Sequence, residues 1–282
     1  MRRSFNRYFP IFVLPTLAAF VISFLIPFVM GIYLSFTNFT TVSNARFVWF
    51  KNYIALFSSG SDFWNAFWFT AKFTVVSTIT VNLIAFVLAL LLTRGKKGTN
   101  FFRTIFFMPN LIGGIVLGYI WQLIINGFLA RLGVDITYSA EYGFWGLVLL
   151  TNWQLIGYMM IIYIAGLQTV PRELHEVAAI DGANAWQSLK NITIPLVAPA
   201  ITICTFLTLT NSFKMFDQNF ALTGGAPGKE TSMLALDIYQ TFYGSVGREG
   251  VGQAKAVIFF LLVALIAGVQ LYFSRRREAK NE

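Results

Sequence analysis

The sequence predicts an all-α membrane protein that crosses the bilayer six times, and three observations predict this class. Of the 282 residues, 56% are hydrophobic, and the mean hydropathy is +0.65. Only 12% are charged, about half the fraction carried by soluble domains. The apolar residues also collect in runs of about 18 or more, the length that crosses roughly 30 Å of hydrocarbon. Such runs are helical because the backbone in lipid must satisfy its own hydrogen bonds.

Each of the six apolar runs is expected to form one transmembrane helix of a single domain covering residues 1–282. The expected spans are 9–36, 63–92, 104–125, 143–167, 194–213 and 256–273. The first run follows Arg2 and Arg3, as the apolar part of a signal peptide would. It is too long for a signal peptide, however, and no small-residue cleavage site follows it. We therefore expect this helix to be retained as an anchor.

The basic residues predict that both termini are cytoplasmic, because inner loops of membrane proteins carry an excess of Lys and Arg. With the N-terminus inside, thirteen basic residues fall on inner segments: Arg2, Arg3, Arg7, Arg94, Lys96, Lys97, Arg103, Arg172, Lys190, Arg275, Arg276, Arg277 and Lys280. Five fall on outer segments: Arg46, Lys51, Arg131, Lys229 and Arg248. Topology thus accounts for the net charge of +9, and no nucleic-acid partner is expected.

The polar loop between the fourth and fifth spans, residues 169–193, has the signals of a two-helix hairpin. Pro171 suits the first turn of a helix, and Gly182 is placed to end that helix in a left-handed conformation. Asn184 suits the N-cap of a second helix, with Gln187 three residues on able to reach back. From the residues alone, two interpretations stay open: a docking element for another protein, and an amphipathic connector on the membrane surface.

Few side chains suited to catalysis or cofactor binding are available. The chain has one Cys and one His, Cys204 and His175, so a metal cluster has almost no support and an internal disulfide is excluded. The segment Gly224–Lys229 resembles a phosphate-binding loop only superficially. Three residues instead of four separate its outer glycines, and Glu230 follows the lysine. We expect the chain itself to bind no cofactor and to catalyse no reaction.

The spacing Glu176–Gly182–Ile192–Pro195 resembles the EAA loop in the permease subunits of ABC importers, with separations of six, ten and three residues. Val177 and Ile194 replace an alanine and a leucine of that motif, and both changes are apolar. Other segments are similar to the carbohydrate-importing branch, in particular to the maltose- and glycerol-3-phosphate-type permeases. These segments are Phe101-Phe102-Arg103, Met108-Pro109, Gly166-Leu167-Gln168, Phe213-Lys214-Met215-Phe216-Asp217 and Leu222-Thr223-Gly224-Gly225-Ala226-Pro227.

This resemblance implies the type I importer permease fold in a bacterial cell membrane, with membrane lipid around the spans. It also implies four kinds of partner: a second, different permease, two cytoplasmic ATPase subunits, an extracytoplasmic solute-binding protein, and a sugar or oligosaccharide substrate. ATP and Mg would bind to the ATPase subunits and not to this chain.

The resemblance further implies that the 169–193 loop and the entry to the fifth span couple the permease to the ATPase. Glu176 would pair with a basic group of the ATPase, Gly182 would permit the turn, and Ile192 and Pro195 would fix the entry into the span. The full set of coupling residues is Glu176, Val177, Ala178, Asp181, Gly182, Ile192 and Pro195.

Polar residues within the apolar runs are the candidates for the substrate pathway, since they are expected to face a cavity or another helix. A sugar needs hydrogen-bonding groups and an aromatic face within an otherwise apolar wall. The candidates are Trp121, Asn152, Gln154, Tyr158, Thr208, Asn211, Ser212 and Met215. Hydrogen bonding between helices is the alternative role for such residues.

An ion-coupled secondary transporter of a small polar solute is the alternative function. Such transporters carry ionisable groups at mid-membrane and often contain repeated halves with broken helices. Here the acidic residues fall outside the apolar runs, with Asp217 nearest, and no repeated half is evident. A membrane-embedded enzyme would need a nucleophile–base pair or metal ligands at one depth, and the sequence offers neither.

Overall fold

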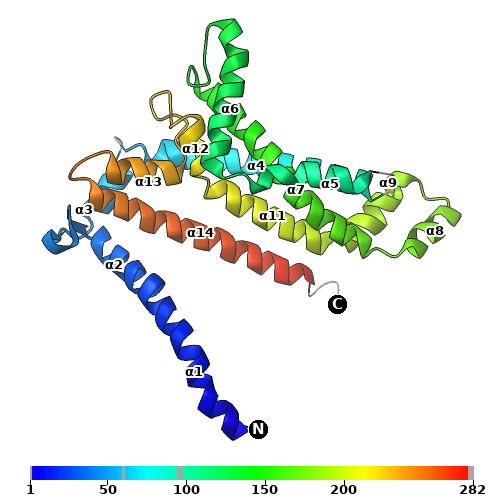
Figure 1. The fold of residues 1–282 in the computed structure, drawn as a ribbon, viewed down its shortest axis with the longest axis horizontal. Coiled ribbons are helices and arrows are strands. Elements are labelled where there is room, and N and C mark those ends of the chain that lie inside the picture. The colour runs from blue at the N-terminus through cyan, green and yellow to red at the C-terminus, as the bar shows by residue number, and fades with distance from the viewer. Residues whose placement is uncertain (1, 59–60, 94–97, 279–282) are drawn as a thin grey trace. The chain divides into compact units, whose positions relative to one another are not determined.

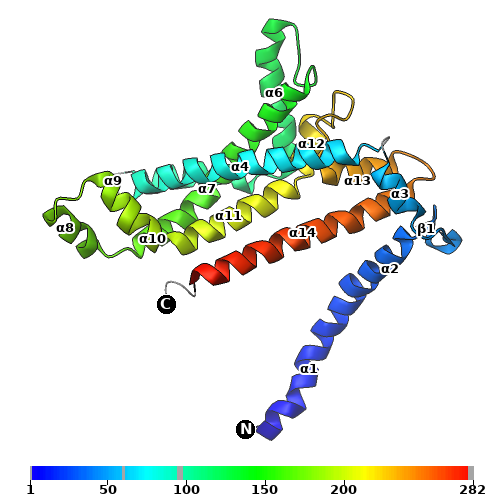
Figure 2. The ribbon, with the colours of Figure 1, turned by 180° about the vertical axis from the view of Figure 1, so that it is seen from behind.

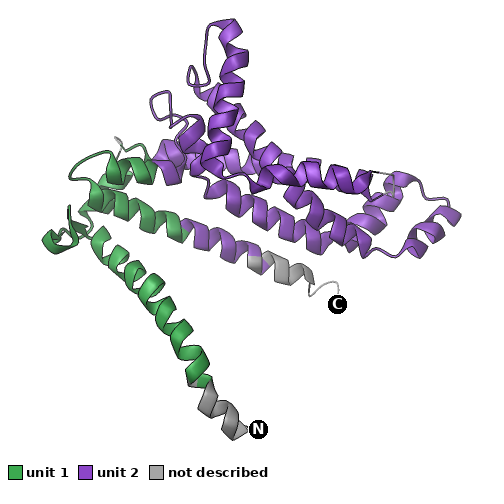
Figure 3. Ribbon diagram, viewed as in Figure 1, with its two compact units in different colours: residues 1–63, 237–261 green, residues 64–236, 262–282 purple. Residues whose placement is uncertain are grey.

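The computed structural model describes residues 2–58, 61–93 and 98–278, and most of them are helical (Figures 1 and 2). They divide into two compact units, which Figure 3 shows in different colours. Unit 1 consists of residues 1–63 and 237–261, and unit 2 of residues 64–236 and 262–282. Four basic residues used for the orientation, Arg94, Lys96, Lys97 and Lys280, lie outside the described residues. The single domain and the cytoplasmic termini stay predictions.

Unit 1 begins with a long apolar helix and continues with a short hairpin. The elements are α1 (Arg2–Phe20), the π-helical turn η1 (Val21–Leu25), α2 (Ile26–Ser35), β1 (Thr37–Asn38), η2 (Val42–Asn44), β2 (Arg46–Phe47) and α3 (Lys51–Phe57). The two strands are antiparallel, with Thr37 opposite Phe47. Most of α13 (Leu234–Tyr243) and the first part of α14 (Glu249–Glu278) complete the unit.

A buried ion pair joins α13 to α14 within unit 1. Lys255 Nζ lies 2.7 Å from Asp237 Oδ2 and donates to Thr241 Oγ1 at 2.9 Å. Lys255 lies inside an apolar helix long enough to cross a membrane, Glu249–Gln270. Leaving a buried charge unpaired destabilises a protein by several kcal/mol, of the order of 3–5. The Asp237 carboxylate therefore makes a buried lysine at this position tolerable.

Unit 2 is a helical bundle in which α4, α7 and α11 run side by side (Figures 1 and 2). Its elements are α4 (Phe63–Leu92), α5 (Thr99–Phe107), η3 (Met108–Leu111), α6 (Gly114–Leu129), η4 (Ala130–Leu132), α7 (Ala140–Gln168), α8 (Arg172–Ile180), α9 (Ala185–Ser188), η5 (Leu189–Thr193), α10 (Ile194–Leu196), α11 (Ala198–Phe213) and α12 (Asp217–Leu222). At one end of the bundle α8 and α9 lie together, and both views show this.

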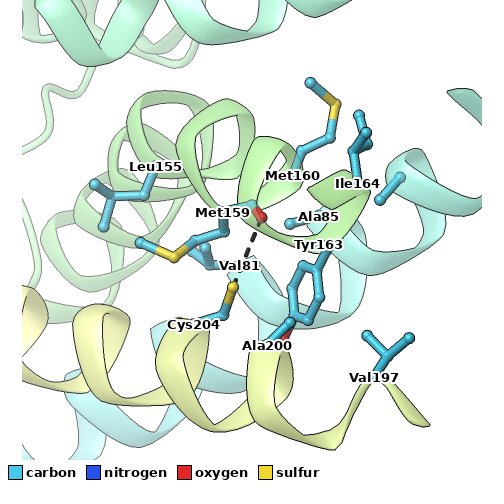
Figure 4. Close-up of a cluster of buried hydrophobic side chains, with 11 residues drawn as sticks. Val81, Ala85, Leu155, Met159, Met160, Tyr163, Ile164, Val197, Ala200 and Cys204 are labelled. Atoms are coloured by element: carbon cyan, nitrogen blue, oxygen red, sulfur yellow. Dashed lines mark hydrogen bonds between the residues drawn. The ribbon is translucent and has the colours of Figure 1, made fainter. Parts of the chain in front are cut away.

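The core of the bundle lies where α7 meets α4 and α11. One buried cluster combines Met159 and Tyr163 of α7 with Val81 of α4 and Cys204 of α11 (Figure 4). The thiol of Cys204 donates to the carbonyl oxygen of Met159 at 3.7 Å. A second cluster centred on Leu117, Leu147 and Leu222 joins α6, α7 and α12. Buried apolar contacts therefore fix the helices that carry the site.

The all-α fold class is confirmed. In the part of the chain that the structure describes, five helices are long and apolar enough to cross a membrane: Ile11–Ser35, Phe63–Leu92, Gly114–Leu132, Ala140–Gln168 and Glu249–Gln270. A sixth crossing is available if the bent pair Ala185–Leu196 and Ala198–Phe213 is counted as one span. The last span starts before the expected Ala256 because Lys255, which interrupts the apolar run in the sequence, is buried with its partner.

The third span starts at Gly114 and not at Thr104, as the sequence predicts. Residues 104–107 belong to α5, which the 3₁₀ turn η3 separates from α6. Pro109 in that turn has no N–H to donate, and Gly113 is extended, with φ −60° and ψ 140°. The helix therefore ends near Met108 and a new one begins at Gly114.

The fifth span is bent by 71° between α10 and α11. The bend lies at Val197, between Pro195 and Pro199, and these two prolines stand in the first turns of the two helices. Proline favours a helix start and cannot continue a preceding helix without loss of a hydrogen bond. The sequence suggests one straight helix over 194–213, whereas the two prolines divide it.

We expect Gly157→Ala to destabilise the bundle, because a methyl group on Gly157 of α7 would overlap the carbonyl oxygen of Phe106 in α5. Overpacking of this kind costs about 2 kcal/mol, or roughly 4–8 °C in the midpoint of thermal unfolding. A thiol-reactive dye measures unfolding here, because the single Cys204 is fully buried.

The matched control is Gly127→Ala, in the last turn of α6, where an added methyl group meets nothing within 4 Å. The control is expected to leave the midpoint unchanged or slightly raised. Equal midpoints for the Gly157 variant and the unaltered protein would contradict the close approach of α5 to α7.

Candidate functional site

The first helix of the 169–193 loop ends in a closed turn at Gly182. Gly182 has φ +81°, the left-handed conformation predicted for it. The N–H of Ala183 donates to the carbonyl of Ala178 at 2.8 Å, and the N–H of Gly182 donates to that of Ala179 at 3.2 Å. This pair of bonds is the Schellman pattern, which satisfies the last carbonyls of α8.

The second helix of the loop begins with a reciprocal cap. The N–H of Gln187 donates to Asn184 Oδ1 at 2.9 Å, and the N–H of Asn184 donates to Gln187 Oε1 at 2.8 Å. This capping box fixes the start of α9, as the sequence predicts. The chain then continues through η5 and α10 to the bend at Val197.

The two arms of the loop are joined to each other and to the bundle. His175 Nδ1 of α8 and Ser188 Oγ of α9 lie 2.8 Å apart, within hydrogen-bonding distance. At the base, Gly166 of α7 faces the bend. A methyl group there would lie 2.7 Å from Ala200 Cβ and 3.3 Å from Val197 Cγ1. The loop is therefore a braced hairpin whose base rests on α7.

The hairpin presents an exposed apolar face. Leu174, Val177 and Ile180 recur every three residues along α8 and are 42%, 55% and 85% exposed. Trp186 of α9 is 67% exposed. Apolar side chains exposed in this way are typical of a surface that another protein or a membrane covers.

The predicted coupling residues divide between surface and core. Glu176, Val177, Asp181, Gly182 and Pro195 are exposed, Ile192 is half-buried, and Ala178 is buried. The acidic and apolar side chains of the hairpin are therefore exposed to solvent. The carbonyl of the buried Ala178 accepts the hydrogen bond that closes the turn.

A polar cleft of about 490 Å³ lies elsewhere in unit 2, where α7, α11 and α12 meet the turn η3. Its lining residues are Asn110, Gln154, Leu155, Asn211, Lys214, Met215, Phe216, Asp217 and Gln218. The cleft combines side-chain amides with one ammonium and one carboxylate group, so it can both donate and accept hydrogen bonds.

Three of the predicted pathway residues line this cleft: Gln154, Asn211 and Met215. Two others are engaged between helices. Thr208 is fully buried and accepts from Asn82 Nδ2 at 3.2 Å, while Asn152 Nδ2 donates to Thr80 Oγ1 at 2.9 Å. For these two, the contacts match the alternative role of hydrogen bonding between helices.

The remaining predicted pathway residues lie apart from the cleft lining. The ring of Trp121 meets that of Trp153 edge-on at 5.7 Å. Tyr158 is half-buried and packs against the cluster around Met159. Ser212 is fully buried, and its hydroxyl has no hydrogen-bond partner among the described residues. Whether any of the predicted residues contacts a substrate stays a prediction.

Four polar cleft residues were not predicted: Asn110, Lys214, Asp217 and Gln218. Asn110 lies inside the expected third span, at the helix break η3, whereas Lys214, Asp217 and Gln218 lie beyond the end of the expected fifth span. Pro109 before Asn110 and the charged pair Lys214 and Asp217 at the end of the fifth span are the signals that mark these positions.

Comparison with known proteins places the chain among membrane transport components. The family model described as "Binding-protein-dependent transport system inner membrane component" matches residues 81–279. The probable starch degradation products transport system permease protein AmyD of Thermoanaerobacterium thermosulfurigenes is 46% identical, covering 96% of this chain and 94% of that protein. The multiple sugar-binding transport system permease protein MsmF of Streptococcus mutans is 30% identical, covering 99% of each.

A solved structure shares the fold. It is a bacterial alginate ABC transporter in complex with an alginate pentasaccharide-bound periplasmic protein. The TM-score is 0.80, with 20% identity, over 98% of this chain and 97% of that chain. At this identity the likeness shows the fold alone.

We expect Gly182→Ala to loosen the hairpin, because a residue with a Cβ atom at φ +81° is strained even where space is open. The cost is about 1 kcal/mol, or roughly fivefold faster amide exchange at Ala183 by local opening. Hydrogen exchange read by mass spectrometry measures this.

Gly133→Ala is the control, since Gly133 has φ +72° and equally open surroundings in another loop. It is expected to speed exchange near its own position and to leave residues 178–187 unchanged. Unaltered exchange at Ala183 in the Gly182 variant would contradict the role given to the turn.

Proposed function

This chain belongs to the family of binding-protein-dependent transport system inner membrane components, and we propose that it is the sugar-conducting permease subunit of an ATP-driven ABC importer. The observation that carries the proposal is the position of α11. This helix starts at the bend that holds the exposed hairpin and ends at the polar cleft. Its 16 residues span about 24 Å. One rigid element therefore connects a docking surface to a ligand site.

A carbohydrate is the substrate that the cleft suits best. Asn110, Gln154, Asn211 and Gln218 supply amides, and Lys214 and Asp217 supply one charge of each sign. Vicinal hydroxyl groups both donate and accept hydrogen bonds, so they match such a lining. The relatives named for transport of starch degradation products and of multiple sugars support this assignment.

The exposed face of the hairpin is the docking surface for the cytoplasmic ATPase. Leu174, Val177 and Ile180 offer apolar area, and Glu176 and Asp181 offer negative charge to a basic groove. In this arrangement the 169–193 loop faces the cytoplasm, as do both termini. The braced hairpin passes movement of the ATPase to α7 and α11.

Three further partners complete the proposed importer: a second permease that pairs with this chain, a pair of ATPase subunits that hold ATP and Mg, and an extracytoplasmic binding protein that delivers the sugar. The alginate transporter solved with its sugar-loaded periplasmic protein supports the last of these. This chain itself holds no cofactor and is not an enzyme.

The experiment that tests the function is purification of the tagged chain from native membranes in mild detergent, with mass spectrometry of the co-purifying chains. We expect a second permease and an ATPase. Ile180→Asp is expected to lose most of the ATPase and to retain the second permease, because it places a charge on the most exposed apolar residue of the hairpin.

Val246→Asp is the matched control, an aliphatic residue that is 96% exposed between α13 and α14. It is expected to retain both partners. Recovery of this chain alone would support the ion-coupled alternative. Full retention of the ATPase by the Ile180 variant would show that the hairpin face is not its docking surface.

We expect Asn211→Leu to reduce sugar transport, since it removes the α11 amide that lines the cleft. Asn211 is exposed in the cleft, so loss of its hydrogen bond to the sugar costs about 0.5–1.5 kcal/mol, or roughly two- to twelvefold in transport efficiency. The measurement is uptake of maltooligosaccharides into proteoliposomes that contain the complete importer, with ATP inside.

Thr202→Val on the same helix serves as the control, because the Thr202 hydroxyl bonds to the carbonyl of Ala198 in its own helix and does not line the cleft. Its uptake should match that of the unaltered importer. Normal uptake by the Asn211 variant would remove α11 from the sugar route.

A further inference from the structure

A pair of side-chain amides bridges the polar cleft from α7 to α12. Gln218 Nε2 donates to Gln154 Oε1 at 2.8 Å. Gln154 is only 8% exposed, and its own Nε2 points to the carbonyl oxygen of Ile112, 3.5 Å away at the end of η3. Both ends of the Gln154 amide therefore have protein partners. Each end of the amide keeps one further hydrogen-bonding position, but at this burial a ligand that reaches it from the cleft competes with Gln218 for the carbonyl oxygen of Gln154.

On its other side, α12 is fixed to α6 through two glycines. A methyl group on Gly114 would lie 2.6 Å from Asp217 Cβ, and one on Gly118 would lie 2.6 Å from Ala221 Cβ. Gln122 Nε2 of α6 also donates to the carbonyl of Leu222, at the end of α12, at 2.9 Å. This close contact holds α6 and α12 together. Buried apolar side chains around Leu147 pack the pair against α7, and the Gln154–Gln218 bond adds a polar contact with α7 at the cleft.

The chain leads directly from α12 to the hairpin. The turn of residues 214–216 joins α12 to α11, and α11 leads back to the bend at Val197. A movement of α12 relative to α7 therefore also moves α11, and the other end of α11 carries the 169–193 loop. Gln154 and Gln218 line the cleft and also join α7 to α12, so a ligand in the cleft can affect this movement.

We propose that Gln154 and Gln218 form a latch that the sugar opens, which makes both of them specificity-determining residues; this inference rests on the proposed function. A sugar hydroxyl donates and accepts as a glutamine amide does, so it can take the place of Gln218 at Gln154 with little net cost. An apolar solute of equal size would leave two desolvated amides unpaired, and such groups are strongly penalised. The latch thus selects hydroxylated solutes and links their entry to the release of α12.

A purely structural clamp would have the same geometry but a different response to mutation. Removing a clamp lowers assembly or stability and leaves the resting activity unchanged or reduced. Removing a latch raises the population of the released state without any sugar, because a latch opposes that release. Resting ATP hydrolysis by the complete importer separates the two.

The test uses Gln218→Leu and Gln154→Leu in the complete importer reconstituted in proteoliposomes. ATP hydrolysis is measured without and with the binding protein loaded with maltooligosaccharide. Loss of one hydrogen bond is expected to raise resting hydrolysis about fivefold and to lower the further stimulation by sugar. The double variant should not exceed the Gln154 variant, because Gln154→Leu already removes the bond to Gln218 together with the one to Ile112.

Gln122→Leu is the control, since it removes a glutamine bond to α12 from the side of α6 and leaves the α7 side intact. Its resting hydrolysis should equal that of the unaltered importer. Resting rates unchanged in both Gln154 and Gln218 variants, with sugar stimulation intact, would overturn the latch. Failure of both variants to assemble would also overturn it, in favour of a clamp. Absence of sugar stimulation in the unaltered importer would instead overturn the proposed function.

Discussion

The arrangement of unit 2 depends on neighbouring segments packing closely against the backbone of α7 at its glycines. Four glycines along this helix each receive a different element. Gly143 meets Thr231 of the loop after α12, Gly146 meets Ile136 of the loop after α6, and Gly157 meets the backbone of α5. Gly166 meets Ala200 next to the bend. In lipid the hydrophobic effect gives no drive for helices to associate, so small residues that permit close contact supply much of it.

Buried hydrogen bonds between helices also hold the bundle together. Those in the middle of the bundle are made by side chains other than the polar ones that line the cleft. The hydroxyl of Tyr163 donates to Asn82 Oδ1 at 2.7 Å, and Asn82 in turn donates to Thr208. This chain of bonds ties α7, α4 and α11 together in the middle of the bundle. Of the polar groups that line the cleft, Gln154 lies in the interior of α7, while Asn110, Lys214, Asp217 and Gln218 lie where helices break or begin. Non-helical backbone is tolerated at membrane depth where it lines a cavity or is buried in protein.

Sequence patterns predicted most of the fold because hydropathy and capping act locally. The helix Phe63–Leu92 has the predicted bounds, and both the Gly182 turn and the Asn184 cap were predicted from residue types alone. The 71° bend, the Lys255–Asp237 pair and the cleft depend on contacts between distant segments. Hydropathy cannot reveal whether a charge in an apolar run has a buried partner, nor whether two prolines bend a helix or only start it.

A loop that transmits movement has to be stiffer than the contact that it moves. The hairpin at one end of α11 has more internal hydrogen bonds than the contact across the cleft at the other end. Five hydrogen bonds brace the hairpin: two at the Gly182 turn, two in the capping box and one between His175 and Ser188. Between α12 and α7 the cleft is bridged by the bond from Gln218 to Gln154. Each of these bonds contributes about 1 kcal/mol, and a buried apolar cluster also packs Leu222 of α12 against Leu147 of α7. The hairpin therefore has five polar bonds, whereas the cleft bridge has one that a ligand can exchange. A sugar hydroxyl that takes the place of Gln218 at Gln154 exchanges this polar part of the contact between α12 and α7, at the end of α11 opposite the hairpin.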